Sequence, residues 1–140
     1  MKVKYKGFYK YDNERIQKYV AHDKTLFAVE ITDVINGKFS GNVEDDISTG
    51  GRPGVGKVSG EISGDKISFI KQMPVASSFG KGGKENNRNT KHPKIYYSGV
   101  AVGQNKFEGR WQIKFGIIFN GLIPIPVIPT SGIWEMEKEK

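Results

Sequence analysis

The alternation of apolar and polar residues restricts the fold of this chain more than any other feature. In residues 3–11, aromatic residues, Val3 and Gly7 occupy every second position, and lysines occupy most of the positions between them. A period of two indicates a strand with one buried face, whereas an amphipathic helix repeats every 3.6 residues. The same alternation returns along the chain and predicts an all-β protein. We expect eight strands, at residues 3–11, 26–31, 38–45, 57–62, 66–73, 94–102, 105–113 and 131–139.

Short turn sequences join most of these segments. Asn36-Gly37 is a strong signal for a two-residue hairpin, and Ser63-Gly64-Asp65 and Gly103-Gln104 separate two further pairs of segments. Successive hairpins predict an antiparallel meander. Only residues 12–24 have a pattern that could hold a short helix.

A glycine recurs in the inward phase of many predicted strands, two residues before an apolar or aromatic residue. Glycine is normally unfavourable inside a strand, so its recurrence indicates bends or a crowded, curved interior. Together with the hairpins, this predicts a single domain over residues 1–140, folded as an antiparallel up-and-down barrel of about eight strands. A β-sandwich is the alternative. The recurring glycines are Gly7, Gly41, Gly60, Gly99, Gly109 and Gly132.

Composition limits the classes of function. The chain of 140 residues contains no cysteine, which excludes disulfides and thiolate metal sites. No apolar run approaches the ~20 residues of a membrane-spanning helix, and the lysine-rich start has no apolar signal region, so we expect a cytoplasmic location. The net charge of +7 gives a mild attraction for polyanions and predicts no specific nucleic acid partner.

The stretch GGRPGVGK, residues 50–57, has the spacing of a phosphate-binding loop in Gly51-x4-Gly56-Lys57. Such a loop needs a helix after it and Ser or Thr after the lysine to hold magnesium. Val58 takes that last position, and the following residues alternate as in a hairpin. Without a helix N-terminus the phosphate loses most of its binding energy. We therefore interpret this stretch as a glycine-rich loop between strands.

The candidate ligand-binding residues lie in the inward phase of the predicted strands. Aromatic walls with a few polar tips are typical of small-molecule pockets, and a lysine among them would meet a ligand carboxylate. The alternative is that these side chains fill the core, because an eight-stranded barrel is only just wide enough for its own side chains. The candidates are Tyr9, Phe69, Lys71, Tyr97 and Trp111.

Two charged residues share the inward phase with apolar neighbours. Lys71 follows Ile67 and Phe69 at intervals of two, and Asp45 follows Val43. A buried charge is costly unless it is paired. One hypothesis places Asp45 and Lys71 near a barrel mouth, where they bind a polar ligand group. The other places each at a strand end, where the charge reaches water.

Residues 81–94 are unusually basic. This segment could contact phosphates or an anionic surface, although it has no aromatic residue on which a base could stack. The alternative is a solvated, mobile loop between two strands. Its charged residues are Lys81, Lys84, Glu85, Arg88, Lys91 and Lys94.

Residues 116–130 are apolar and interrupted by Pro124, Pro126 and Pro129. Prolines at this spacing are incompatible with a helix or a central strand. So much apolar surface is not expected to remain in water. The segment therefore covers a barrel opening or the outer wall, or it is a lid that faces a partner, a ligand or a membrane.

The strand order, with Gly7-x-Tyr9 at the start and Gly132-x-Trp134 at the end, resembles the small calycin and avidin-like barrels. The resemblance implies a barrel that commonly holds a small apolar ligand, in a group where many bacterial proteins have no assigned role. Lipocalins carry Gly-x-Trp in their first strand, where this chain has Gly7-Phe8-Tyr9. No ligand-contacting residue is therefore carried over.

These patterns contain no nucleophile–base pair, metal-ligand cluster or cofactor motif, which favours a protein that is not an enzyme. We expect a β-barrel that binds a small apolar ligand at one end, with residues 116–130 as a lid. The alternative function is an interaction module that docks on a protein, a polyanion or an anionic membrane through residues 81–94 and 116–130.

Overall fold

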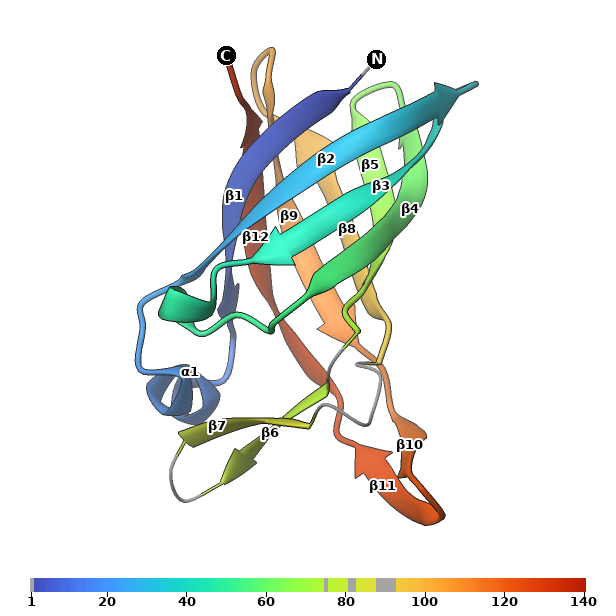
Figure 1. Ribbon diagram of the computed structural model, residues 1–140. Helices are drawn as coiled ribbons and strands as arrows, with labels where there is room; N and C mark the ends of the chain where they lie inside the picture. Colours follow the sequence, from blue (N-terminus) through green and yellow to red (C-terminus); the bar gives the residue numbers. More distant parts are fainter. Residues whose placement is uncertain (1, 75, 81–82, 88–92) are drawn as a thin grey trace.

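The computed structural model describes residues 2–74, 76–80, 83–87 and 93–140. Eight strands form one closed antiparallel barrel, in the order β1-β12-β9-β8-β5-β4-β3-β2 (Figure 1). This confirms the predicted up-and-down barrel, and the sandwich alternative is wrong. The barrel strands are β1 (Val3–Tyr11), β2 (Thr25–Ile35), β3 (Lys38–Asp45), β4 (Val55–Ser63), β5 (Lys66–Gln72), β8 (Ile95–Ala101), β9 (Lys106–Ile113) and β12 (Thr130–Lys138).

The remaining elements are short. They are the helix α1 (Glu14–Val20), the 3-10 turn η1 (Ile47–Thr49), and the strands β6 (Ala76–Gly80), β7 (Gly83–Asn87), β10 (Gly116–Asn120) and β11 (Ile123–Val127). The Asn13 side chain caps α1 by accepting hydrogen bonds from the backbone N–H groups of Arg15 and Ile16. The helix lies within the segment that the sequence predicted.

The two ends of the barrel differ (Figure 1). The short β2–β3, β4–β5 and β8–β9 turns lie at the upper end, beside both chain termini. Asn36 and Gly37 both have positive φ there, 53° and 80°, which confirms the predicted two-residue turn. The helix α1, the glycine-rich loop after η1, and the β6–β7 and β10–β11 hairpins all lie at the lower end. The elements outside the barrel wall are therefore gathered at one mouth.

The recurring strand glycines occupy positions where a neighbouring strand approaches closely. A Cβ added at Gly132 would overlap the carbonyl oxygen of Lys10 and come within 2.6 Å of the Trp111 ring. The added Cβ would overlap a backbone carbonyl oxygen of the adjacent strand at the other five positions as well. The prediction of a crowded, curved interior is confirmed.

The core occupies the barrel interior and is rich in aromatic residues. Phe69 and Tyr97 stack with ring centroids 4.6 Å apart, and Trp134 packs edge-on against both rings at 5.4 and 5.5 Å. Tyr11 and Trp111 make a similar edge contact at 5.2 Å. Inward alternation thus brings side chains from many strands into one packed interior.

Three of the expectations from the sequence concern segments outside the regular barrel wall. The phosphate-loop match runs into strand β4 and not into a helix; residues 50–54 form the predicted loop, and residues 55–57 already belong to the strand. Residues 83–87, expected in a loop, form β7 because they pair with β6. The sequence predicts that basic residues between 81 and 92 contact an anionic partner. The side chains of these residues are not among those that the structure describes.

Candidate functional site

The five predicted site residues lie in one contiguous cluster inside the barrel. Each is at most 4% exposed. Tyr9 packs against Trp111 with ring centroids 6.0 Å apart, and the Phe69–Tyr97 stack continues the cluster. The Lys71 ammonium lies 4.7 Å from the Tyr9 ring centroid and 6.0 Å from that of Tyr97. The aromatic members therefore contact one another as core residues do, and their contact with a ligand stays a prediction.

Lys71 and Asp45 form a buried ion pair within this cluster. Lys71 Nζ lies 2.6 Å from Asp45 Oδ1, and the two side chains are 1% and 0% exposed. The hypothesis that each charge reaches water at a strand end is wrong, because both side chains are buried. Each charge instead satisfies the other, as a low-dielectric interior requires.

The second oxygen of Asp45 is also bound. Asp45 Oδ2 accepts a hydrogen bond from the Tyr9 hydroxyl at 3.1 Å and a longer one from the Arg52 backbone N–H at 3.4 Å. Arg52 Nη1 in turn donates to the Tyr9 hydroxyl oxygen at 3.3 Å. The Tyr9 hydroxyl therefore bridges the carboxylate and the guanidinium.

Arg52 is the site residue that the sequence analysis missed. Its side chain enters the lower end of the barrel from the glycine-rich loop before β4 and is only 3% exposed. Among the side chains that the structure describes, no carboxylate lies in ion-pair distance of it, and its Nε atom has no hydrogen-bond partner. The signal was an arginine between Gly51 and Pro53, in a stretch considered only as a phosphate loop. Two buried cations thus lie near Asp45, but only Lys71 forms an ion pair with it, and the Arg52 guanidinium reaches it through the Tyr9 hydroxyl.

The buried setting changes the acidity of these groups. Burial lowers the pKa of Lys71, although Asp45 opposes this. Burial acts to raise the pKa of Asp45, but the attraction of Lys71 and Arg52 outweighs it and holds that pKa below its ordinary value. Burial and the Asp45 charge raise the pKa values of Tyr9 and Tyr97 well above 10.0. Both tyrosines are therefore neutral hydrogen-bonding groups at neutral pH.

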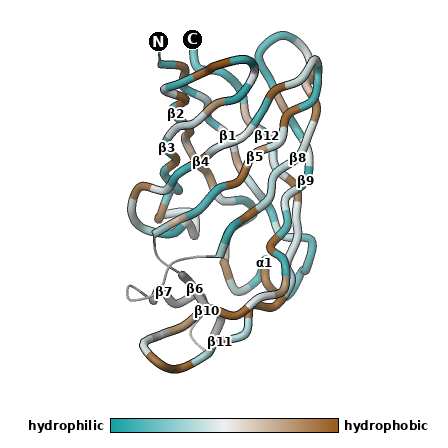
Figure 2. The backbone as a smooth tube through the Cα atoms, turned by 90° about the vertical axis from the view of Figure 1, so that its right-hand side faces the viewer, coloured by the Kyte–Doolittle hydropathy of each residue, from teal (hydrophilic) through white to brown (hydrophobic). Residues whose placement is uncertain are grey.

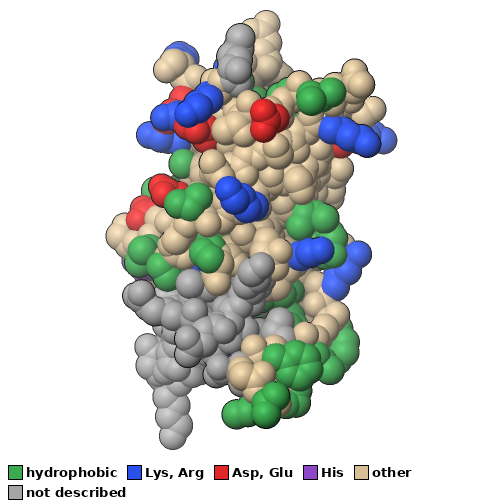
Figure 3. All heavy atoms as spheres, turned by 45° about the vertical axis from the view of Figure 1, so that its right-hand side comes forward, with side chains coloured by type: hydrophobic (Ala, Val, Ile, Leu, Met, Phe, Trp, Pro, Cys, Tyr) green, Lys and Arg blue, Asp and Glu red, His purple; other side chains and the backbone are tan. Residues whose placement is uncertain are grey.

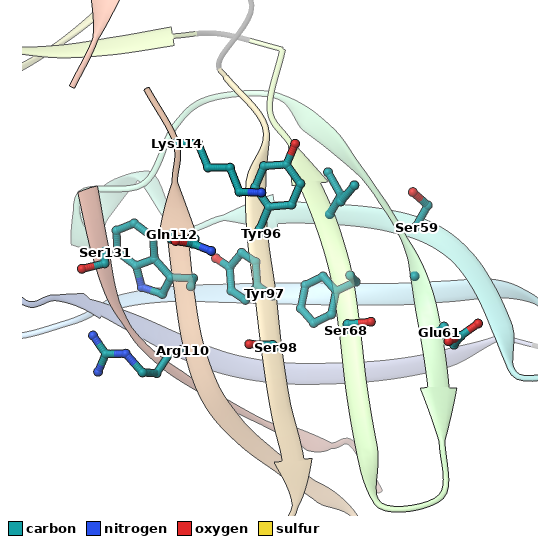
Figure 4. Close-up of a pocket in the computed structure, with 14 residues that line it drawn as sticks. Ser59, Glu61, Ser68, Tyr96, Tyr97, Ser98, Arg110, Gln112, Lys114 and Ser131 are labelled. Atoms are coloured by element: carbon teal, nitrogen blue, oxygen red, sulfur yellow. The ribbon is translucent and has the colours of Figure 1, made fainter. Parts of the chain in front are cut away.

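A shallow groove runs over the outer wall of the barrel (Figure 4). It encloses about 850 Å³, and outward side chains of β4, β5, β8, β9 and β12 line it. Its two cationic side chains already have partners: Arg110 pairs with Asp12, and Lys114 lies 4.4 Å from the Tyr96 ring centroid. The groove therefore offers mainly hydroxyl and amide groups. The hydroxyl and amide groups belong to Ser59, Ser68, Ser98, Gln112 and Ser131, and Glu61 adds a carboxylate.

The β10–β11 hairpin presents an apolar surface at the lower end (Figures 2 and 3). Leu122, at its tip, is 97% exposed. No charged residue occurs between Lys114 and Glu135, although 26% of the chain is charged. The expectation of simple structural cover is wrong for much of this segment, because it does not bury its own side chains. The exposed large hydrophobic residues are Phe115, Ile117, Phe119, Leu122, Ile123 and Ile128.

The register of this hairpin explains its prolines. Asn120 pairs with Ile123 across a two-residue turn in which Gly121 has a φ of 64°. Such a turn closes on a hydrogen-bonded pair, and hydrogen-bonded and non-bonded pairs then alternate along the ladder. Pro124 and Pro126 therefore occupy non-bonded positions, where a backbone N–H would point away from β10. The free edge of β11 thus lacks outward N–H donors at both positions.

Comparisons with known proteins identify no relative. No family model, curated protein or solved structure matches this chain. The closed barrel agrees with calycin-like folds in general architecture. Among the described residues, no helix has the length and apolar character needed to cross a membrane. Within the same residues, no group of three or more metal-binding side chains is placed to hold an ion.

Proposed function

We propose that this protein is a non-enzymatic β-barrel that attaches to a membrane surface through the β10–β11 hairpin. The observation that carries this proposal is the exposed, uncharged apolar hairpin at the lower end. A contiguous apolar surface of this kind marks an interaction site in a folded protein. Docking on an anionic membrane is the alternative function that the sequence raised, and the hairpin lies within residues 116–130 of that prediction.

Three features favour lipid over a folded protein partner. Large side chains on both faces of the hairpin are exposed, including Ile117 on one face and Ile123 on the other. An interface with a single protein would need only one apolar face. The prolines of β11 remove donors that would be costly in hydrocarbon. The net charge of +7 adds attraction to anionic headgroups.

Co-sedimentation with vesicles tests the proposal. Phosphatidylcholine vesicles measure the apolar contribution, and vesicles that also contain phosphatidylglycerol add the electrostatic one. We expect Leu122→Asp to lower partitioning at least about tenfold, because transfer of a leucine side chain contributes roughly 1.5–3 kcal/mol. High salt should weaken only the contribution of the anionic lipid.

The matched control is Ile35→Asp. Ile35 is 71% exposed, so it allows the same charge change at the end of β2, beside the β2–β3 turn and at the opposite end of the barrel. This variant should pellet with vesicles as the unchanged protein does. Failure of the unchanged protein to pellet with either vesicle would reject lipid attachment and leave a protein as the occupant of the hairpin.

A second candidate function is the binding of a small apolar ligand with an acidic group at the lower barrel end. Arg52 favours it, because this buried cation has no ion-pair partner among the side chains that the structure describes. Lys71 was the expected contact for such a carboxylate, but it is committed to Asp45. Titration of tryptophan fluorescence with fatty acids and retinoids tests this candidate through Trp111, and no change with any of them would contradict it.

A further inference from the structure

We propose that the side chains of Lys71 and Asp45 condense to an intramolecular isopeptide bond in the folded protein. This is an activity of the chain on itself, and it is independent of membrane attachment. The proposal starts from geometry. The amine nitrogen and a carboxylate oxygen are held 2.6 Å apart, and the two side chains are 1% and 0% exposed.

The attacking and attacked atoms are already close. With Nζ 2.6 Å from Oδ1, the carbon of the carboxylate lies about 3–3.5 Å from the nitrogen, which is the range of a near-attack arrangement. Packing fixes this geometry, since the ammonium also lies 4.7 Å from the Tyr9 ring centroid and 5.4 Å from that of Phe27. The two groups would therefore react within one molecule, and they lose little orientational freedom in reaching the transition state.

Burial favours the neutral form of the attacking amine. A buried ion pair can lower its desolvation cost by moving one proton along the short hydrogen bond, which gives an amine and a carboxylic acid. Burial lowers the pKa of Lys71 and so favours the amine, whereas Lys71 and Arg52 hold the pKa of Asp45 below its ordinary value, so the proton has to reach Oδ1 along the short hydrogen bond itself.

The reaction is balanced within the two side chains. One proton passes from Nζ to Oδ1, and the nitrogen lone pair then attacks the Asp45 carboxyl carbon. The tetrahedral intermediate gives a second nitrogen proton to Oδ1, and the bond between carbon and Oδ1 breaks to release water. The ammonium and carboxylate charges disappear together, and an amide remains. The reaction needs no oxidant, reductant or further reactant.

Tyr9 and Arg52 are placed to stabilise the intermediate. Negative charge develops on Oδ2, which already accepts hydrogen bonds from the Tyr9 hydroxyl at 3.1 Å and the Arg52 backbone N–H at 3.4 Å. Donors held at such a position stabilise the charge that forms during acyl transfer. The Arg52 guanidinium, bound to the same hydroxyl at 3.3 Å, adds a positive charge nearby.

Mass measurement of the purified full chain after denaturation tests the proposal. Loss of one water makes the protein about 18 Da lighter than its sequence mass. Tryptic digestion should then give residues 39–57 joined to residues 67–81, with no cleavage after Lys71. A protein of full sequence mass, with cleavage after Lys71, would overturn the proposal and leave a buried salt bridge.

Two variants complete the test. Lys71→Met cannot form the bond and should have its own full sequence mass, which controls for water loss elsewhere in the chain. Tyr9→Phe keeps the ring but removes a hydrogen bond to Oδ2, so we expect a mixture of cross-linked and unmodified chains at early times after expression. A deficit of the same mass in Lys71→Met would show that the water is lost at another site and would overturn the proposal.

Discussion

At the scale of single residues, two glycines and two tryptophans on β9 and β12 form reciprocal pairs. Gly132 is the register partner of Trp111, and Trp134 is the partner of Gly109. Each indole lies over the strand that carries its glycine partner. The Trp111 N–H donates to the carbonyl oxygen of Lys10 at 3.1 Å, the same oxygen that a side chain at Gly132 would meet. The absence of a side chain at Gly132 therefore leaves the space that the buried indole needs to reach this acceptor.

This arrangement predicts a large effect of Gly132→Ala. The new methyl group would overlap the Lys10 carbonyl and crowd the Trp111 ring, so we expect a loss of at least about 2–4 kcal/mol in the free energy of unfolding. Urea titration followed by tryptophan fluorescence measures this loss. Gly116→Ala is the control, because no atom lies within 4 Å of its added Cβ, and its stability should change by less than about 0.5 kcal/mol. Similar stability of the two variants would contradict the steric argument.

The buried phenols predict the behaviour of the protein in alkali. Burial and Asp45 raise the pKa values of Tyr9 and Tyr97 well above 10.0 in the folded state, whereas the unfolded chain ionises near that value. Their contribution to stability is thus complete below pH ~10 and is lost as the pH rises from there toward the folded pKa. Phenolate absorbance should show some of the six tyrosines titrating early and the remainder only with loss of β circular dichroism. Smooth ionisation of all tyrosines in a folded protein would contradict this.

At the scale of elements, the β10–β11 hairpin combines an exposed apolar surface with a protected edge. Two-stranded hairpins are marginal in water, and a free apolar edge invites pairing with another chain. Pro124 and Pro126 remove outward donors from β11 without breaking its ladder to β10. The hairpin can therefore remain apolar without offering that edge to a second copy.

Restoring the missing donors should cause self-association. In Pro124→Ala/Pro126→Ala the outer edge of β11 gains two N–H groups, so we expect dimers or larger species at concentrations where the unchanged protein is monomeric. Sedimentation velocity measures this change. Pro129→Ala, outside the β11 ladder, serves as the control and should sediment as the unchanged protein does. A monomeric double variant would show that the prolines do not protect the edge.

The same hairpin marks the limit of what the sequence could predict. All eight barrel strands follow from local alternation and turn residues, because both signals act over a few neighbouring positions. Prolines in residues 116–130 were taken to exclude a central strand, which is correct, but alternate positions on an edge strand tolerate them. The strands β10 and β11 were missed for that reason.

The candidate site was predicted only in part, for a related reason. The inward phase correctly placed Lys71 and Asp45 inside the barrel, because phase is a property of each strand. Their pairing depends on how β3 and β5 meet across β4, which no local pattern contains. Arg52 belongs to a loop, where side chains do not alternate between an inner and an outer face. The alternation therefore did not indicate that its side chain enters the core.

At the scale of the whole molecule, the barrel wall and the lower-end elements have separate tasks. The wall closes by pairing the first strand with the last, from Tyr5 with Lys138 to Tyr11 with Gly132. Both termini therefore lie together at the upper end, away from the hairpin (Figure 1). The hairpin pairs only within itself, and its loss should leave the barrel ladders intact.

Circular permutation tests this separation. A short glycine–serine linker between the original termini keeps the β1–β12 pairing, and new termini are tolerated at exposed turns. Opening the chain between Gly121 and Leu122 splits the hairpin, so this permutant should retain β circular dichroism and cooperative unfolding but lose vesicle binding at least about tenfold. Opening it between Gly64 and Asp65 cuts an upper-end turn of the wall and should retain both properties. If the first permutant unfolded, or bound vesicles as well as the second, the hairpin would not be a separable binding element on a self-sufficient barrel.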